Sequence, residues 1–103
     1  MKIIEQANDL LWNSLDSARC FIEKSLKLRE EYPSLSRALY EASLDDMDHV
    51  SRIHEEIVKL IQEYRQKTGE PPEAMLAVYN YLHEKYIDRA SKIRILQNMY
   101  KNT

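Results

Sequence analysis

The segment Thr68-Gly69-Glu70-Pro71-Pro72-Glu73 holds the only glycine and two of the three prolines of this 103-residue chain. Gly69 follows Arg65 and Lys67, and a glycine just after basic residues is typical of a helix C-terminus. Two prolines followed by an acidic residue are typical of the first turn of the next helix. The segment therefore predicts that one helix ends near Gly69 and that another begins near Glu73.

The third proline lies in Glu30-Glu31-Tyr32-Pro33-Ser34, where a proline disfavours the helical conformation of the residue before it and suits the start of a new helix. The two breaks predict three helices, over roughly residues 3–31, 34–67 and 72–101. Long helices of matched length joined by short turns favour an all-α fold, an antiparallel bundle of three long helices in one domain over residues 1–103.

Composition excludes several classes of protein. A single glycine argues against sandwiches, barrels and phosphate-binding loops, which need glycine at strained or crowded positions. Fifteen Lys and Arg against 17 Asp and Glu leave no basic surface for nucleic acid, and the mixed charges disfavour membrane binding. Glu5 and Asp9 argue against a signal peptide, so we expect a cytoplasmic protein. The lone Cys20 is expected to be a buried or half-buried apolar residue.

Apolar side chains recur along one face of each predicted helix at about 100° per residue. In the first helix this stripe contains Ala7, Leu11, Leu15, Ala18, Phe21, Ile22, Ser25 and Leu28. In the second it contains Leu35, Leu39, Ala42, Val50, Ile53, Ile57, Leu60, Ile61 and Tyr64, and in the third Met75, Tyr79, Leu82, Tyr86, Ala90, Ile93 and Tyr100. Two features favour a homo-oligomer, a dimer or higher. The helices are longer than about 25 residues, and the third helix has apolar residues outside its stripe, at Tyr81, Ile95 and Met99. These three residues could equally well be scattered apolar residues of the surface.

The centre of the second stripe falls on Asp46, which lies between Ala42 and Ile53, and His49 lies one turn further along the same side. A carboxylate on an apolar face needs a cation, a metal, hydrogen-bond donors or a proton. A spacing of three residues brings the Asp46 and His49 side chains together, as metal ligation or a carboxylate–imidazole hydrogen bond requires.

Asp46-Met47-Asp48-His49 resembles the Glu-x-x-His motif of the ferritin-like superfamily. Within that superfamily the chain looks most similar to small rubrerythrin-like and half-bundle bacterial proteins. The resemblance covers about residues 14–61 and implies a ferritin-like helical hairpin, followed here by a third helix and completed by oligomerisation. It also implies metal binding, iron above all, by Asp46 and His49. The family carries a further Glu on the preceding helix, where this chain has Ser14. That difference argues against ordinary ferroxidase activity. We therefore predict no catalytic residue, and whether the chain is an enzyme stays open.

Two interpretations of Asp46 remain open. In a dimer, two Asp46 and two His49 side chains would supply two nitrogens and two oxygens, a set that zinc or iron accepts. Alternatively, Asp46 would accept hydrogen bonds from His49 and from Tyr79 or Tyr86, with His83 at the margin, in a buried polar network. The second interpretation corresponds to a non-catalytic structural, assembly or adaptor protein that has lost its metal site.

Overall fold

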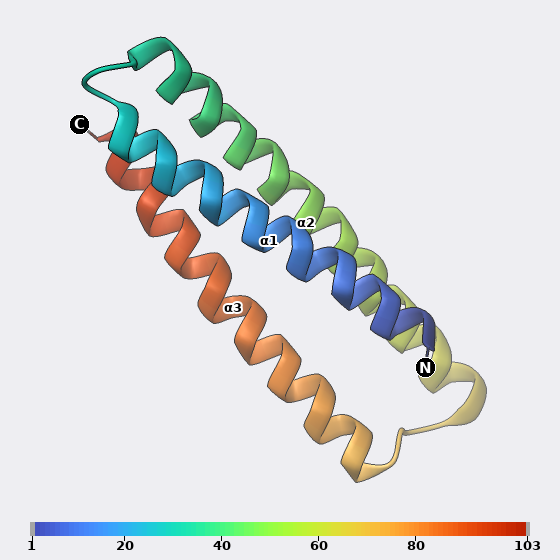
Figure 1. Ribbon diagram of the computed structural model, residues 1–103. Helices are drawn as coiled ribbons and strands as arrows, with labels where there is room; N and C mark the ends of the chain where they lie inside the picture. Colours follow the sequence, from blue (N-terminus) through green and yellow to red (C-terminus); the bar gives the residue numbers. More distant parts are fainter. Residues whose placement is uncertain (1, 103) are drawn as a thin grey trace.

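The structure, a computed structural model, describes residues 2–102 and confirms the all-α three-helix bundle. The helices are α1 (Lys2–Leu28), α2 (Pro33–Thr68) and α3 (Glu73–Lys101), and each runs antiparallel to the one before it (Figure 1). The bundle is elongated, with extents of 56 × 18 × 17 Å. Over residues 2–102, none of the helices contains an apolar stretch long enough to cross a membrane.

The two turns lie where the prolines and the glycine predict them. α1 ends at Leu28, three residues earlier than expected, and the backbone N–H of Tyr32 donates to the Leu28 carbonyl at 2.8 Å. Tyr32 has φ −132° and ψ 66°, outside the helical region, as its position before a proline requires. Gly69 has φ +85°, a conformation that favours glycine, and its N–H closes the end of α2 on the Arg65 carbonyl at 2.9 Å.

The seam between α1 and α2 is the most tightly packed part of the bundle. Ser25 and Ser36 are fully buried there, and each hydroxyl donates to the other residue's backbone carbonyl at 2.6 Å. Small side chains allow two helices to approach closely, and here they also pair their own polar atoms. The apolar core continues along the seam and includes Ile93 of α3; its buried members are Ile4, Leu11, Leu15, Ala18, Ile22, Met47, Val50, Ile57 and Ile93.

α3 packs most closely at its C-terminal end. The Tyr100 ring stacks on Tyr40 of α2 with the centroids 4.3 Å apart, and the Arg29 guanidinium lies over Tyr100 and donates to its carbonyl. Buried Gln97 donates to Ser43 of α2 at 3.2 Å. Toward Glu73 the helix diverges from the α1–α2 hairpin (Figure 1), and its fully buried side chains lie only in the C-terminal third, at Ile93 and Gln97.

Several burial predictions were wrong. Cys20 is exposed, and Leu35 is half exposed at 50%. The buried line of α2 does not pass through Asp46 but through Ser36, Ser43, Met47, Val50 and Ile57. The reason is the placement of α3. It contacts α2 on the side of Ser43, so the core is rotated toward that side and Asp46 lies at its edge.

Candidate functional site

Asp46 and His49 lie side by side on α2, as their spacing predicts. Oδ1 of Asp46 is 3.7 Å from Nδ1 of His49, which is too long for a hydrogen bond. The Asp46 side chain is 17% exposed and the His49 side chain 57% exposed. Oδ2 of Asp46 is buried and has no hydrogen-bond partner. The carboxylate is therefore mostly removed from water and holds one oxygen whose hydrogen-bonding capacity is unused.

The pair lies on the flank of the α1–α2 hairpin that α3 does not cover. On α2, His54 stacks on α3, and Asp46 is about 80° away from His54 around the helix. On α1, Asp16 bonds to Arg89 of α3, and Ser14 is about 160° away from Asp16. The sides of the two helices that carry Asp46 and Ser14 are therefore turned away from the sides that contact α3, and together they form one flank of the hairpin.

Apart from Asp46 and His49, this uncovered flank is largely apolar. Leu10 is 60% exposed on α1, and the half-buried residues around it and on α2 lie at helical spacing on the same side. We call this surface the hairpin flank and define it by Ala7, Leu10, Ser14, Phe21, Leu39, Ala42, Asp46, His49, Ile53 and Leu60. The hairpin flank therefore places the carboxylate of Asp46 among half-buried apolar side chains, with Leu10 as the exposed apolar residue.

The predicted hydrogen bonds from α3 to Asp46 are not formed. The Tyr79 hydroxyl is buried without any hydrogen-bond partner, so it does not reach the carboxylate. Tyr86 stacks on His54 with the ring centroids 4.5 Å apart, and His83 stacks on His54 at 5.5 Å. These three residues of α3 face a different side of α2 from Asp46, because α3 packs against Ser43 and His54.

Tyr86 and His83, which the sequence interpretation placed around Asp46, instead form a three-ring cluster with His54, a residue to which that interpretation gave no role. His54 is half-buried, and burial, together with the nearby charge of His83, lowers its pKa below the ordinary value of 6.5. Burial also raises the pKa of Tyr79 above 10.0, with smaller effects from Tyr64 and Glu5. The spacing of His54 from Val50 and Ile57 puts it on the buried side of α2, so the sequence did contain a signal for it.

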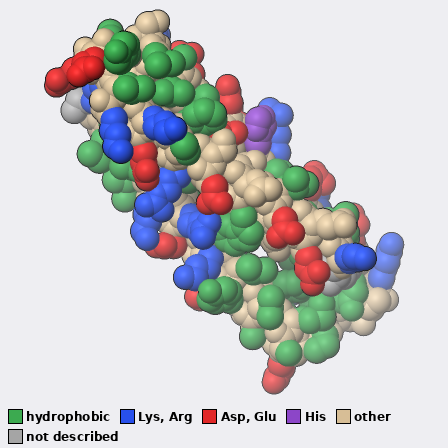
Figure 2. Space-filling view, viewed as in Figure 1, with side chains coloured by type: hydrophobic (Ala, Val, Ile, Leu, Met, Phe, Trp, Pro, Cys, Tyr) green, Lys and Arg blue, Asp and Glu red, His purple; other side chains and the backbone are tan. Residues whose placement is uncertain are grey.

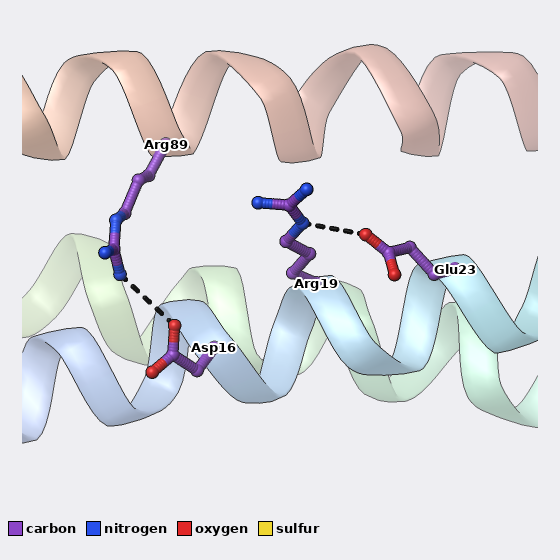
Figure 3. A network of polar contacts seen from close by, with 4 residues as sticks. All are labelled: Asp16, Arg19, Glu23 and Arg89. Carbon is purple, nitrogen blue, oxygen red and sulfur yellow. Dashed lines mark hydrogen bonds and ion pairs between the residues drawn. The ribbon is translucent and has the colours of Figure 1, made fainter.

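A second unpredicted feature is a cleft of about 450 Å³ between α1 and α3 whose rim is rich in cations. Figure 2 shows Lys and Arg side chains gathered over the middle of this face. Arg89 reaches from α3 to Asp16 of α1 at 3.2 Å, and its guanidinium lies 5.0 Å from the centre of the Trp12 ring. Arg19 points between the helices and donates to Glu23 at 2.7 Å (Figure 3). These cations are occupied by ion pairs that join or flank the two helices.

One chain supplies two candidate metal ligands at the hairpin flank. Within residues 2–102, His, Cys, Asp and Glu nowhere gather in a group of three or more that could hold a metal ion. A four-coordinate site therefore needs ligands from a second chain. Comparisons with protein-family models, curated proteins and solved structures find no match to this chain.

Proposed function

We propose that this chain is a ferritin-like helical bundle protein that binds iron or zinc between two copies of itself, through Asp46 and His49 of each copy. One observation supports this most directly: the Asp46 carboxylate has a buried oxygen, Oδ2, with no hydrogen-bond partner. A metal ion bound through the other carboxylate oxygen, Oδ1, would place positive charge beside this buried group, as a buried carboxylate requires.

The donor atoms fit a shared metal in type and spacing. Asp46 Oδ1 and His49 Nδ1 are 3.7 Å apart, whereas two ligands of one tetrahedral zinc, each bonded at about 2.0–2.1 Å, lie about 3.3 Å apart. A small rotation of the exposed His49 side chain closes that difference. Carboxylate and imidazole are ligands of both zinc and iron.

A second copy is the partner that completes the ligand set. In a two-fold symmetric dimer the same surface meets itself, so any residue near the axis is brought close to its own copy. Two hairpin flanks packed in this way would form a four-helix arrangement and cover exposed apolar residues such as Leu10. Asp46 and His49 of both copies would then supply two oxygens and two nitrogens.

Metal analysis of the purified full-length chain tests this proposal. We expect one iron or zinc per two chains after loading and removal of excess metal, and we expect the double variant Asp46→Ala, His49→Ala to retain none. Asp45→Ala is the matched control, because Asp45 is an exposed carboxylate on the same helix. Equal metal contents in the double variant and in the control would contradict the proposal.

A second candidate function is that of a structural or assembly protein without metal. The apolar character of the hairpin flank favours it, because such a surface would drive pairing whether or not a metal binds. Light scattering combined with metal analysis separates the two. A dimer with background metal, unchanged by Asp46→Asn, supports the assembly role, and a metal-dependent dimer supports metal binding. A strict monomer contradicts both.

A further inference from the structure

The cleft of about 450 Å³ between α1 and α3, which we call the α1–α3 cleft, has cations on both sides. The two helices run parallel (Figure 1), and Asp16 bonds to Arg89 across the cleft at a sequence separation of 73 residues. Lys92 follows Arg19 by the same separation, so these two cations lie at one level on opposite sides. Arg89 is one turn from that level. Three cations from two helices therefore line the same part of the cleft.

The guanidinium of Arg19 has hydrogen-bond donors to spare. Its Nε donates to Glu23 at 2.7 Å, and in the described part of the chain no hydrogen bond engages its two terminal amino groups. Figure 3 shows both of these nitrogens in the gap between α1 and α3. Two neighbouring N–H donors of a guanidinium match two oxygens of one phosphate or carboxylate. The cleft therefore contains a pair of donors that its own carboxylates do not use.

The charge of the α1–α3 cleft favours an anion. Among the described residues that line it, four are cations and two are carboxylates, whereas the whole chain has a net charge of −2. Lys85 takes part in none of the ion pairs of the described chain. Arg89 and Lys92 are paired only with exposed carboxylates. Exposed ion pairs contribute little to stability, so an incoming dianion can compete for these cations.

The end of the cleft nearer to the diverging part of α3 suits an organic group. Half-buried Trp12 of α1 lines it together with Tyr81 and Leu82 of α3. Arg89 connects this end to the cations, because its guanidinium lies 5.0 Å from the centre of the Trp12 ring. A phosphate bound by Arg19 and Arg89 would therefore bring an attached organic group next to Trp12.

We propose that the α1–α3 cleft binds a small phosphate monoester, whose organic group packs against Trp12. The phosphate contacts Arg19, Arg89 and Lys92. The volume of the cleft is within the usual range for small-molecule sites, about 300–1,000 Å³, and such sites combine apolar side chains with a few polar groups that orient the ligand. The cleft is on the α3 side of α1, away from the hairpin flank. This site and the proposed metal site can therefore each fail without the other.

Phenyl phosphate and inorganic phosphate are the probes. Each is titrated into the ¹⁵N-labelled full-length chain at low salt, with a metal chelator present. Trp12 is the only tryptophan, so its indole N–H gives a single signal that reports on the cleft. We expect saturable shifts of this signal with phenyl phosphate, and an affinity that falls as salt is added. Phenyl phosphate should bind at least about threefold more tightly than inorganic phosphate, because its ring adds apolar contact.

In Arg19→Gln the affinity for phenyl phosphate should fall about tenfold, because a charge and two donors are lost. Lys92→Gln should also weaken binding and keeps the test decisive if Arg19→Gln does not fold. Arg37→Gln is the matched control. Arg37 also bonds through Nε to a glutamate four residues further on, but it is exposed on α2 and does not line the cleft. Its replacement should leave the affinity unchanged.

Three results would overturn the proposal. The first is the absence of a saturable shift of the Trp12 signal with phenyl phosphate. The second is equal affinity for phenyl phosphate in Arg37→Gln and in either folded cleft variant, Arg19→Gln or Lys92→Gln. The third is binding of inorganic phosphate as tight as that of the ester, which would show that the organic group makes no contact.

Discussion

Replacing Asp46 by leucine should stabilise the metal-free protein. Oδ2 of Asp46 is buried without a partner, and Oδ1 is 3.7 Å from His49 Nδ1, too far for a hydrogen bond. Leaving one polar group buried and unpaired costs about 1–3 kcal/mol, and a charged group costs more. A leucine removes that cost and adds apolar contact on a side chain that is 17% exposed. We therefore expect the free energy of unfolding to rise by about 1–3 kcal/mol in Asp46→Leu.

Asp45→Leu is the control for this change, because Asp45 is exposed on the same helix. Asp45→Leu measures the effect of the higher helix propensity of leucine, about 0.5 kcal/mol, at a position where no buried carboxylate is removed. Both variants are unfolded in urea with a metal chelator present and at one protein concentration, since an oligomer's stability depends on concentration. A gain in Asp46→Leu no larger than that in Asp45→Leu would refute the reasoning that Asp46 is held in an unfavourable environment.

Three further changes test other parts of the bundle. Burial, and to a smaller extent the charge of His83, lowers the pKa of His54 in the folded state, so the unfolded state binds a proton more readily. The free energy of unfolding should therefore be highest above about pH 6.5 and decrease as the pH falls below that value. Calorimetry of His54→Phe should show a smaller decrease. Ser43→Ala leaves the NH2 group of the buried Gln97 side chain without its acceptor and should lower the free energy of unfolding in urea by about 1–2 kcal/mol. Adding Gln97→Leu should recover most of this loss, and strictly additive losses would contradict the coupling. The exposed Cys20 thiol should react with a disulfide reagent as fast in the native protein as in urea, and protection in the native state would show that it is covered.

The helices and their order could be predicted from the sequence because the signals are local. Pro33 and Gly69 act on the backbone of their own turns, and the structure has its breaks within three residues of the predicted positions. The stripes on α1 and α3 were also largely correct, since Leu11, Leu15 and Ile93 are buried as expected. Where the buried residues of a helix follow one apolar stripe, a 3.6-residue period is enough to find it.

The position of Asp46 was predicted less well, because the apolar residues of α2 do not form one narrow stripe. The apolar residues of α2 between Leu35 and Tyr64 spread over a wider arc of the helix surface than one neighbouring helix can cover. The sequence does not say which part of this arc α3 covers. The fully buried Ser36 and Ser43 decide this, one by pairing with Ser25 and the other by accepting from Gln97. Serines are usually read as surface residues, so a pattern of apolar residues alone rotates the predicted core away from them.

The same two serines explain why the hairpin flank is left open. A helix packs closest where the facing side chains are small, and on α2 those positions are Ser36 toward α1 and Ser43 toward α3. With α3 held on the Ser43 side, Asp46, Ile53 and Leu60 lie at the edge of the core and are only half-buried. An apolar strip that contains a mostly buried carboxylate needs both an apolar partner and a positive or donating group. Two copies of the flank joined by a metal would satisfy both requirements with residues that this chain already carries.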